Sequence, residues 1–201
     1  MTLSYARFAG YAALGAAVSG FLYSVAFIIV ARSSPATGAA LAGLFLLTGG
    51  ILATAVMVAL YGTLRDVDGS FAMWALLLGV VGALGSAVHG GYDLANGINP
   101  PGTGTGGLPS QVDPRGLLTF GVTGIAVAVF AWLISRNRNL PTRLAYVGYV
   151  SAFLLEVLYL GRLIILDATN PLIVVAALLG GFVVNPAWYA WLGAVFIRGR
   201  R

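Results

Sequence analysis

The chain has no cysteine and no lysine among its 201 residues. Without cysteine it can form no disulfide, no thiolate nucleophile and no cysteine-ligated metal site. Without lysine it can form no Schiff base, which excludes a retinal-type pigment. His89 is the single histidine, so a bis-histidine haem within one chain and the three nitrogen or sulfur ligands of a catalytic zinc are also excluded. We therefore expect no metal and no cofactor.

Charged residues are scarce as well, at 8% of the chain, whereas 59% is hydrophobic and the mean hydropathy is +0.93. No soluble core needs so much apolar surface, but six helices of about 20 residues with short links would account for the length. We predict an all-α polytopic integral membrane protein, with residues 1–201 forming a single bundle of six transmembrane helices. The expected spans are residues 11–31, 37–64, 71–89, 116–134, 144–166 and 172–197.

The net charge of +5 comes from arginines that flank the apolar stretches and form no basic stripe for nucleic acid. We therefore expect a lipid bilayer as partner and no nucleic acid. With six spans, eight arginines fall on one side and two on the other, an asymmetry that predicts cytoplasmic N and C termini. The eight are Arg7, Arg65, Arg136, Arg138, Arg143, Arg198, Arg200 and Arg201, and the two are Arg32 and Arg115.

Three of the expected spans begin with a capping residue followed by proline, namely Ser34-Pro35, Asp113-Pro114 and Asn170-Pro171. Proline suits the first helical position because its missing N–H is not needed there. Residues 93–114, rich in glycine and proline, are expected to form a flexible outer loop. The GTGTGG run in this loop lacks the preceding strand and closing Gly-Lys-Ser/Thr of a phosphate-binding loop, so we expect no nucleotide there.

The fifth span carries two charged residues, Glu156 and Arg162, within an otherwise apolar stretch. Its thirteen Leu, Ile, Val and Phe residues favour insertion by roughly 4–8 kcal/mol, and each charge at mid-depth costs about 2.5–3.5 kcal/mol. The span should therefore insert only if other helices or water shelter both groups. Glu156, Tyr159 and Arg162 step around a sector of about 120°, so these side chains can line one cavity.

Glu156 has two interpretations, which the sequence leaves open. An ionisable group at mid-bilayer indicates an ion path, a proton relay or a ligand contact. Alternatively, a protonated Glu156 bonded to Tyr149, Tyr159 or Asn185 would serve only to hold the helices together.

Arg162 also has alternatives. It can pair with Asp93, Asp167 or Glu156, bind an anionic ligand group, or extend to the outer interface. Because helical side chains lean toward the N-terminus, a buried partner is favoured slightly.

Two further places carry polar groups. His89 and Asp93 are one helical turn apart, which fits either a proton-accepting pair at the mouth of a cavity or simple interface residues. Asn185-Pro186 interrupts the sixth span, and the proline predicts a kink. Broken helices mark binding sites in transporters, but proline kinks are also common in inert spans.

Pairs of small residues four apart, such as Gly79 and Ala83, permit close helix contacts.

Short motifs support a resemblance to a known family. They are Arg7-Phe8-Ala9-Gly10 before the first span, Leu140-Pro141-Thr142-Arg143-Leu144 at the fifth, and Trp188 to Trp191 with Arg198-Gly199 at the close. On these residues the chain resembles the bacterial six-span membrane proteins of domain-of-unknown-function (DUF) family 4386. The fifth span departs from that pattern, with Leu144-Ala145-Tyr146 where such proteins tend to have Trp-Leu-Gly. The resemblance implies a bacterial plasma (inner) membrane protein and supplies no catalytic residues.

We therefore expect a non-enzymatic membrane protein whose polar pocket binds a small or lipidic ligand, or which acts as a sensor or accessory subunit. A small proton-coupled transporter using Glu156 and Arg162 is the alternative. An intramembrane enzyme has least support, because no paired aspartates, Ser–His pair or metal cluster is evident. A homo-oligomer and a partner membrane subunit both stay open. The candidate ligand-binding residues are Glu156, Tyr159, Arg162, Asn185, His89 and Asp93.

Overall fold

The computed structural model describes residues 3–99, 114–167 and 169–199. All the elements in these ranges are helical, and no strand is present in them. The elements are α1 (Leu3–Ser24), the π-helix η1 (Val25–Val30), α2 (Ala31–Ser33), α3 (Pro35–Leu64), α4 (Gly69–Ile98), α5 (Pro114–Gly116), the π-helix η2 (Leu117–Val122), α6 (Thr123–Arg136), α7 (Thr142–Ile164), α8 (Pro171–Leu179), the π-helix η3 (Gly180–Val184) and α9 (Asn185–Arg198).

Six helical runs in the described ranges are long and apolar enough to cross a membrane. They confirm the prediction of an all-α integral membrane protein built from a six-helix bundle. The runs are Ser4–Ser33, Pro35–Leu64, Gly69–Ile98, Leu117–Arg136, Thr142–Ile164 and Pro171–Arg198.

The third span is longer than predicted. We expected it to end at His89 and the outer loop to begin at Asp93, but α4 continues to Ile98. The predicted end followed the fall in hydropathy at the first polar residues. The helix continues beyond that point because its last turns still pack on α3. A Cβ atom added at Gly97, for example, would lie 2.8 Å from the Cα atom of Ala40. Most of the predicted loop, residues 100–113, lies outside the described residues.

The proline signature marks helix starts as predicted. The elements α3, α5 and α8 begin at Pro35, Pro114 and Pro171. The Asn170 side chain accepts a hydrogen bond from the backbone N–H of Leu172 at 3.0 Å. Ser34, by contrast, does not cap the backbone, because its hydroxyl donates to the Thr37 hydroxyl at 2.8 Å. Asp113 lies outside the described residues.

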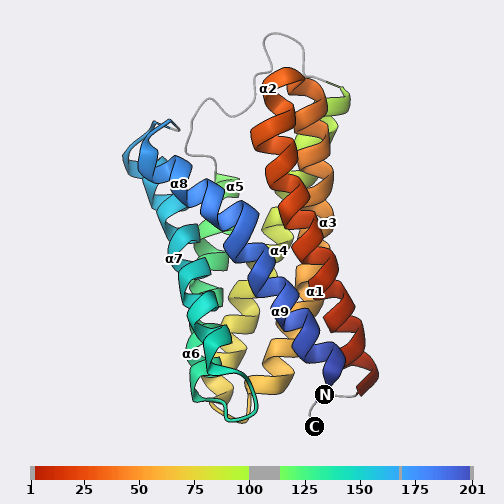
Figure 1. The fold of residues 1–201 in the computed structure, drawn as a ribbon, viewed down its shortest axis with the longest axis vertical. Helices are drawn as coiled ribbons and strands as arrows, with labels where there is room; N and C mark the ends of the chain where they lie inside the picture. The colour runs from red at the N-terminus through yellow and green to blue at the C-terminus, as the bar shows by residue number, and fades with distance from the viewer. Residues whose placement is uncertain (1–2, 100–113, 168, 200–201) are drawn as a thin grey trace.

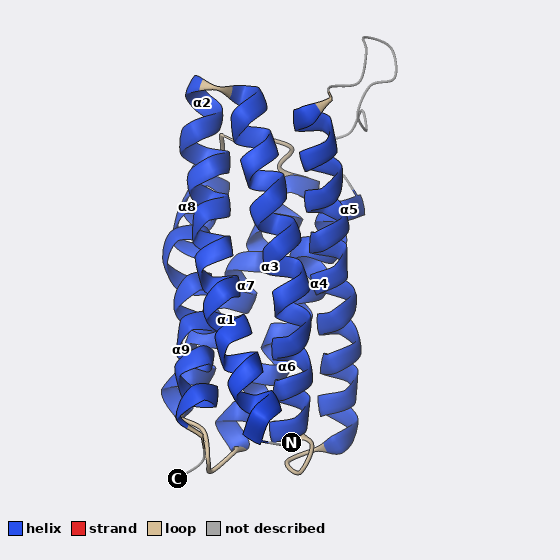
Figure 2. Ribbon diagram, turned by 90° about the vertical axis from the view of Figure 1, so that its right-hand side faces the viewer, coloured by secondary structure: helices blue, strands red, loops and turns tan. Residues whose placement is uncertain are grey.

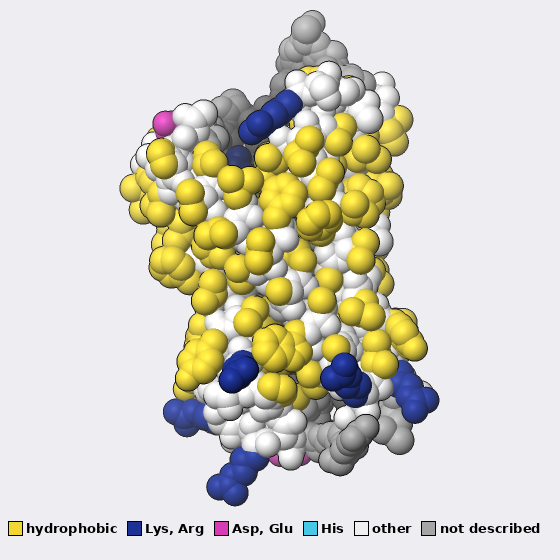
Figure 3. Space-filling model, viewed as in Figure 1, with side chains coloured by type: hydrophobic (Ala, Val, Ile, Leu, Met, Phe, Trp, Pro, Cys, Tyr) yellow, Lys and Arg dark blue, Asp and Glu magenta, His cyan; other side chains and the backbone are white. Residues whose placement is uncertain are grey.

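The helices form an elongated bundle in which α1 begins and α9 ends at the same end (Figures 1 and 2). We call this the terminal end and the opposite one the distal end. Cationic side chains gather around the terminal end, and fewer are visible at the distal end (Figure 3). The element pairs with the most extensive packing are α3 with α4, α1 with α3, and α1 with α9.

Most of the large, fully buried side chains lie toward the terminal end. They come from the end of α3, the second half of α6, the start of α7, and α9. The largest are Trp188, Phe130, Met57, Leu60, Leu64, Leu133, Ile134, Leu144 and Leu192. Toward the distal end α7 and α8 diverge from α1 and α2 (Figure 1), whereas α3 and α4 stay in close contact.

Candidate functional site

A cavity of about 290 Å³ lies inside the bundle, and each of the six spans contributes to its wall. Most of the lining is apolar or small, such as Phe27, Leu46 and Ala83. The polar lining residues are Tyr23, Ser24, Ser86, Thr119, Thr123, Arg162, Asn185 and Tyr189. A concave, mainly apolar space with a few polar groups is the usual form of a small-molecule site.

Three π-helices form part of the wall of this cavity. Phe27 and Ile28 come from η1, Thr119 and Phe120 from η2, and Gly181 from η3. A π-helix is wider than an α-helix, is rare, and appears mostly as a single turn, frequently at functional sites. The three π-helices lie in spans one, four and six, so half of the six spans are widened where they border the cavity.

Arg162 lies on the cavity wall, and within the described ranges it is the one charged residue that does so. It shares a stripe of α7 with Leu155 and Leu158, at the three- and four-residue spacing of one helix face. In the described part of the chain its guanidinium makes no ion pair or hydrogen bond. The phenol of Tyr23, from the first span, belongs to the same cavity wall.

The predicted carboxylate partners of Arg162 are engaged elsewhere or point elsewhere. Asp93 pairs with His89 and Arg115, as shown below. Asp167, in the turn after α7, accepts hydrogen bonds from the backbone N–H and the hydroxyl of Thr169 at 2.8 and 2.7 Å. These two bonds hold the pKa of the exposed Asp167 carboxyl below its usual value.

Asn185 also lines the cavity, at the level where η3 passes into α9. Its side-chain oxygen accepts a short hydrogen bond from the hydroxyl of Ser151, which is buried on α7. Pro186 follows as one of the first residues of α9, so the lost N–H falls where the π-turn ends. The polar pair thus ties α7 to the widened helix beside the cavity.

Glu156 and Tyr159 face a different side of α7 and do not line the cavity. The carboxylate of Glu156 packs against Gly124 of α6, where an added Cβ would lie 2.5 Å from Oε1. The ring of Tyr159 packs in the same way against Gly121 of η2. Oε1 of Glu156 is buried and has no hydrogen-bond partner among the described residues. The suggested bond to Asn185 is therefore not formed through this oxygen.

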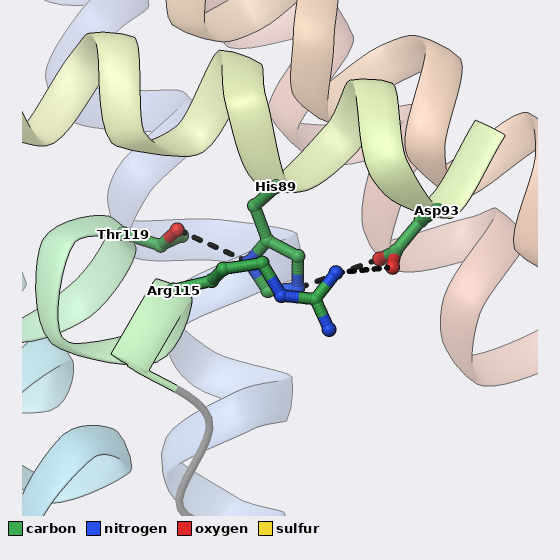
Figure 4. Close-up of polar contacts among 4 residues, drawn as sticks. All are labelled: His89, Asp93, Arg115 and Thr119. Carbon is green, nitrogen blue, oxygen red and sulfur yellow. Dashed lines mark hydrogen bonds and ion pairs between the residues drawn. The ribbon is translucent and has the colours of Figure 1, made fainter. Parts of the chain in front are cut away.

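His89 and Asp93 belong to a polar cluster that joins α4 to α5 and η2 (Figure 4). The Nε2 atom of His89 lies 3.4 Å from one carboxylate oxygen of Asp93, and a guanidinium nitrogen of Arg115 lies 3.3 Å from the other. The Nδ1 atom of His89 lies 3.2 Å from the hydroxyl of Thr119. The guanidinium carbon of Arg115 also stands 4.1 Å from the centre of the Tyr92 ring.

The predicted site residues thus fall into three groups. Arg162 and Asn185 line the cavity, Glu156 and Tyr159 lie between α7 and the fourth span, and His89 and Asp93 form the cluster on α4. Thr119 connects two of these places, because it lines the cavity and contacts His89. Sequence reasoning missed Ser151, Tyr23, Thr119 and Arg115 as members of these groups.

In the ranges that the structure describes, no three His, Asp or Glu side chains come together as metal ligands would. No family model, curated protein or solved structure matches the chain. The site is therefore interpreted from its own geometry.

Proposed function

We propose that this membrane protein is non-enzymatic and holds a small or lipidic ligand in its central cavity, as a sensor or an accessory subunit. The observation that carries the proposal is the cavity itself, about 290 Å³ in volume and walled by all six spans. This volume is near the lower end of the roughly 300–1,000 Å³ of ligand pockets. The three π-turns in its wall support a binding role, because such turns are frequent at functional sites.

We also propose a cellular location and an orientation in the membrane. The arginines of the terminal end favour a cytoplasmic position for both termini, since positive residues accumulate on the cytoplasmic side. We place the protein in the plasma (inner) membrane of a bacterium, as a multi-pass protein. Membership of DUF family 4386 stays a prediction, and so does association with a second copy or another membrane subunit.

Filling the cavity tests the binding role. Ala177 lines the cavity on α8, so Ala177→Phe should occupy the space that the ligand needs. The neighbouring Leu178 is 41% exposed and does not line the cavity, so Leu178→Phe is the matched control. Each variant is purified, extracted with solvent and analysed by mass spectrometry for retained small molecules.

We expect a compound retained in near-stoichiometric amount by the unmodified protein and by Leu178→Phe, but lost from Ala177→Phe. Retention that is the same in all three proteins, or absent from all three, would contradict a ligand in the cavity.

A second candidate function is proton-coupled transport with Glu156 as the proton carrier, although Arg162, its expected charge partner, faces the cavity instead. The buried, unpartnered Oε1 of Glu156 favours it, because an ionisable group at this depth is costly and by default suggests a functional role. Substrate uptake into proteoliposomes should then depend on a pH gradient and be lost in Glu156→Gln at equal expression. Uptake that ignores the gradient argues against this candidate.

A further inference from the structure

The charge of the cavity wall indicates which kind of ligand would bind in the cavity. Arg162 supplies the single positive charge among the described lining residues, and none of those residues is acidic. A guanidinium in an apolar setting is costly unless an anion compensates it. Among the described carboxylates, Asp93 is paired with His89 and Arg115, and Asp167 with Thr169. Glu156 faces Gly124 of α6. None of these three groups compensates Arg162, so an anionic group of the ligand would fill that role.

The rest of the wall indicates an apolar chain next to that anion. Leu158 and Leu155 lie on the same stripe of α7, toward the terminal end from Arg162, and Phe45 and Met57 of α3 line the same cavity. A free inorganic anion would leave this apolar part of the cavity unfilled. A cavity of about 290 Å³ is small for a two-chain lipid and is suited to part of one chain.

Two elements of the cavity wall are not closely packed on each other. In the described residues, α8 packs extensively against α7 and η3 but not against η1. Both lips of the gap contribute to the wall, Phe27 and Ile28 from η1 and Ile173 and Ala177 from α8. In Figure 3 the surface is hollowed between α8 and α2, and dark-blue cationic side chains are visible within and beside the hollow.

We infer that the ligand is an anionic amphiphile whose carboxylate or phosphate group pairs with Arg162 and whose apolar chain lies between η1 and α8. This inference rests on the proposed binding function. The guanidinium offers a bidentate pair to either oxyanion. The phenol of Tyr23, which lines the same cavity, offers a neutral donor to the head group.

Binding to the full-length purified protein in a neutral detergent tests this inference. Radiolabelled oleate is the probe, and the competitors are oleyl phosphate, oleyl alcohol and inorganic phosphate. We expect oleyl phosphate to compete as oleate does, oleyl alcohol to bind roughly ten- to hundredfold more weakly, and inorganic phosphate not to compete. The factor is that of one charge-assisted hydrogen bond.

Variants of Arg162 test whether its guanidinium causes the preference for an anionic head group. Arg162→Gln should reduce the affinity for oleate to that for oleyl alcohol, and Arg162→Lys should keep most of the preference for the anion. The control is Arg143→Gln, since Arg143 is exposed at the other end of the same helix and lies outside the cavity wall. The comparison of head groups on the unmodified protein remains decisive if Arg162→Gln does not fold.

The outcomes separate this inference from the function on which it rests. Equal affinity for oleate and oleyl alcohol, with both lost in Ala177→Phe, would overturn the anionic head group and leave the binding function standing. Competition by inorganic phosphate as strong as that by oleyl phosphate would overturn the apolar chain. Oleate binding that is unchanged in Ala177→Phe would overturn the cavity as the site, and the binding function with it.

Discussion

Asp93 is the residue on which the polar cluster of the distal end depends. Its carboxylate contacts His89 through one oxygen and Arg115 through the other. These contacts join α4 to the start of the fourth span, on either side of residues 100–113. We expect the cluster to hold these two spans together rather than to bind the ligand of the cavity, because neither His89 nor Asp93 lines the cavity wall.

Asp93→Asn should therefore lower the stability of the fold. Losing the charge weakens both contacts, and we expect a cost of about 1–2 kcal/mol, or a fall of a few degrees in Tm. Asp66→Asn is the control, since Asp66 forms an exposed ion pair with Arg65 that should contribute little. Thermal unfolding in detergent measures both variants, and equal Tm values for them would contradict the role of Asp93.

Asp167 predicts a pH dependence outside the membrane-spanning segments. Hydrogen bonds from Thr169 lower the pKa of its carboxyl in the folded protein. A lowered pKa means that the stabilisation is complete above the ordinary carboxyl pKa of about 3.9 and is lost as the pH falls through the folded value. The turn between α7 and α8 should thus loosen only in acid.

A carbon NMR titration of the Asp167 carboxyl checks this directly. Its midpoint should lie below the ordinary aspartate value and should rise toward that value in Thr169→Ala. A midpoint at or above the ordinary value in the unmodified protein would show that the hydrogen bonds do not form.

At the scale of elements, the hairpin of α3 and α4 is the closest helix pair. A Cβ at Gly90 would lie 2.5 Å from the carbonyl oxygen of Gly43, and one at Gly50 would lie equally close to that of Ala83. Rigid backbone stands at each of these contacts, so a side chain cannot be accommodated by a rotamer change. Sequence analysis found Gly79 and Ala83 as a small pair but missed Gly43, Gly50 and Gly90.

Gly90→Ala should force the two helices apart and cost about 1–3 kcal/mol. The adjacent Gly91→Ala is a matched control, because its added Cβ would meet only the Leu47 side chain at 3.4 Å. That change should be neutral or slightly stabilising, since alanine favours a helix over glycine. Chemical denaturation of both variants gives the comparison, and similar midpoints would contradict the close packing of the hairpin.

Element starts were predictable where a local rule determines them, as at Pro35 and Pro171. The extra turns of α4 were not, because they depend on contact with α3 rather than on hydropathy. The π-helix η3 has a local signal in Gly180, Gly181 and the following Pro186. The π-helix η1 contains neither glycine nor proline, so its widened turn has no such signal in the sequence.

At the scale of the whole molecule, composition and the lengths of the apolar stretches predicted a six-helix membrane bundle. These properties can be read from the sequence without knowing how the helices pack. Which site residues lie together could not be predicted in this way, because it depends on how the helices pack. Glu156 and Arg162 are six residues apart on one helix, but one faces Gly124 of α6 and the other the cavity. The sector of about 120° between them, which we took as one wall, spans two interfaces.

The distribution of arginines over six spans predicts the orientation of the chain in the membrane. Both termini and the turn at Arg65–Asp68 should be cytoplasmic, and the turn at Arg32–Ser34 should face outward. Reporter fusions that are active only on one side of the membrane would map these positions. Termini on opposite sides would contradict the six-span arrangement.

The central claim is that the cavity beside Arg162 holds an amphiphile. A high-resolution experimental structure of the protein, purified from its own membrane without added lipid, tests this most directly. We predict elongated density between η1 and α8 that ends at the guanidinium of Arg162. A cavity filled only with water, with Arg162 paired to a carboxylate of the chain, would contradict it.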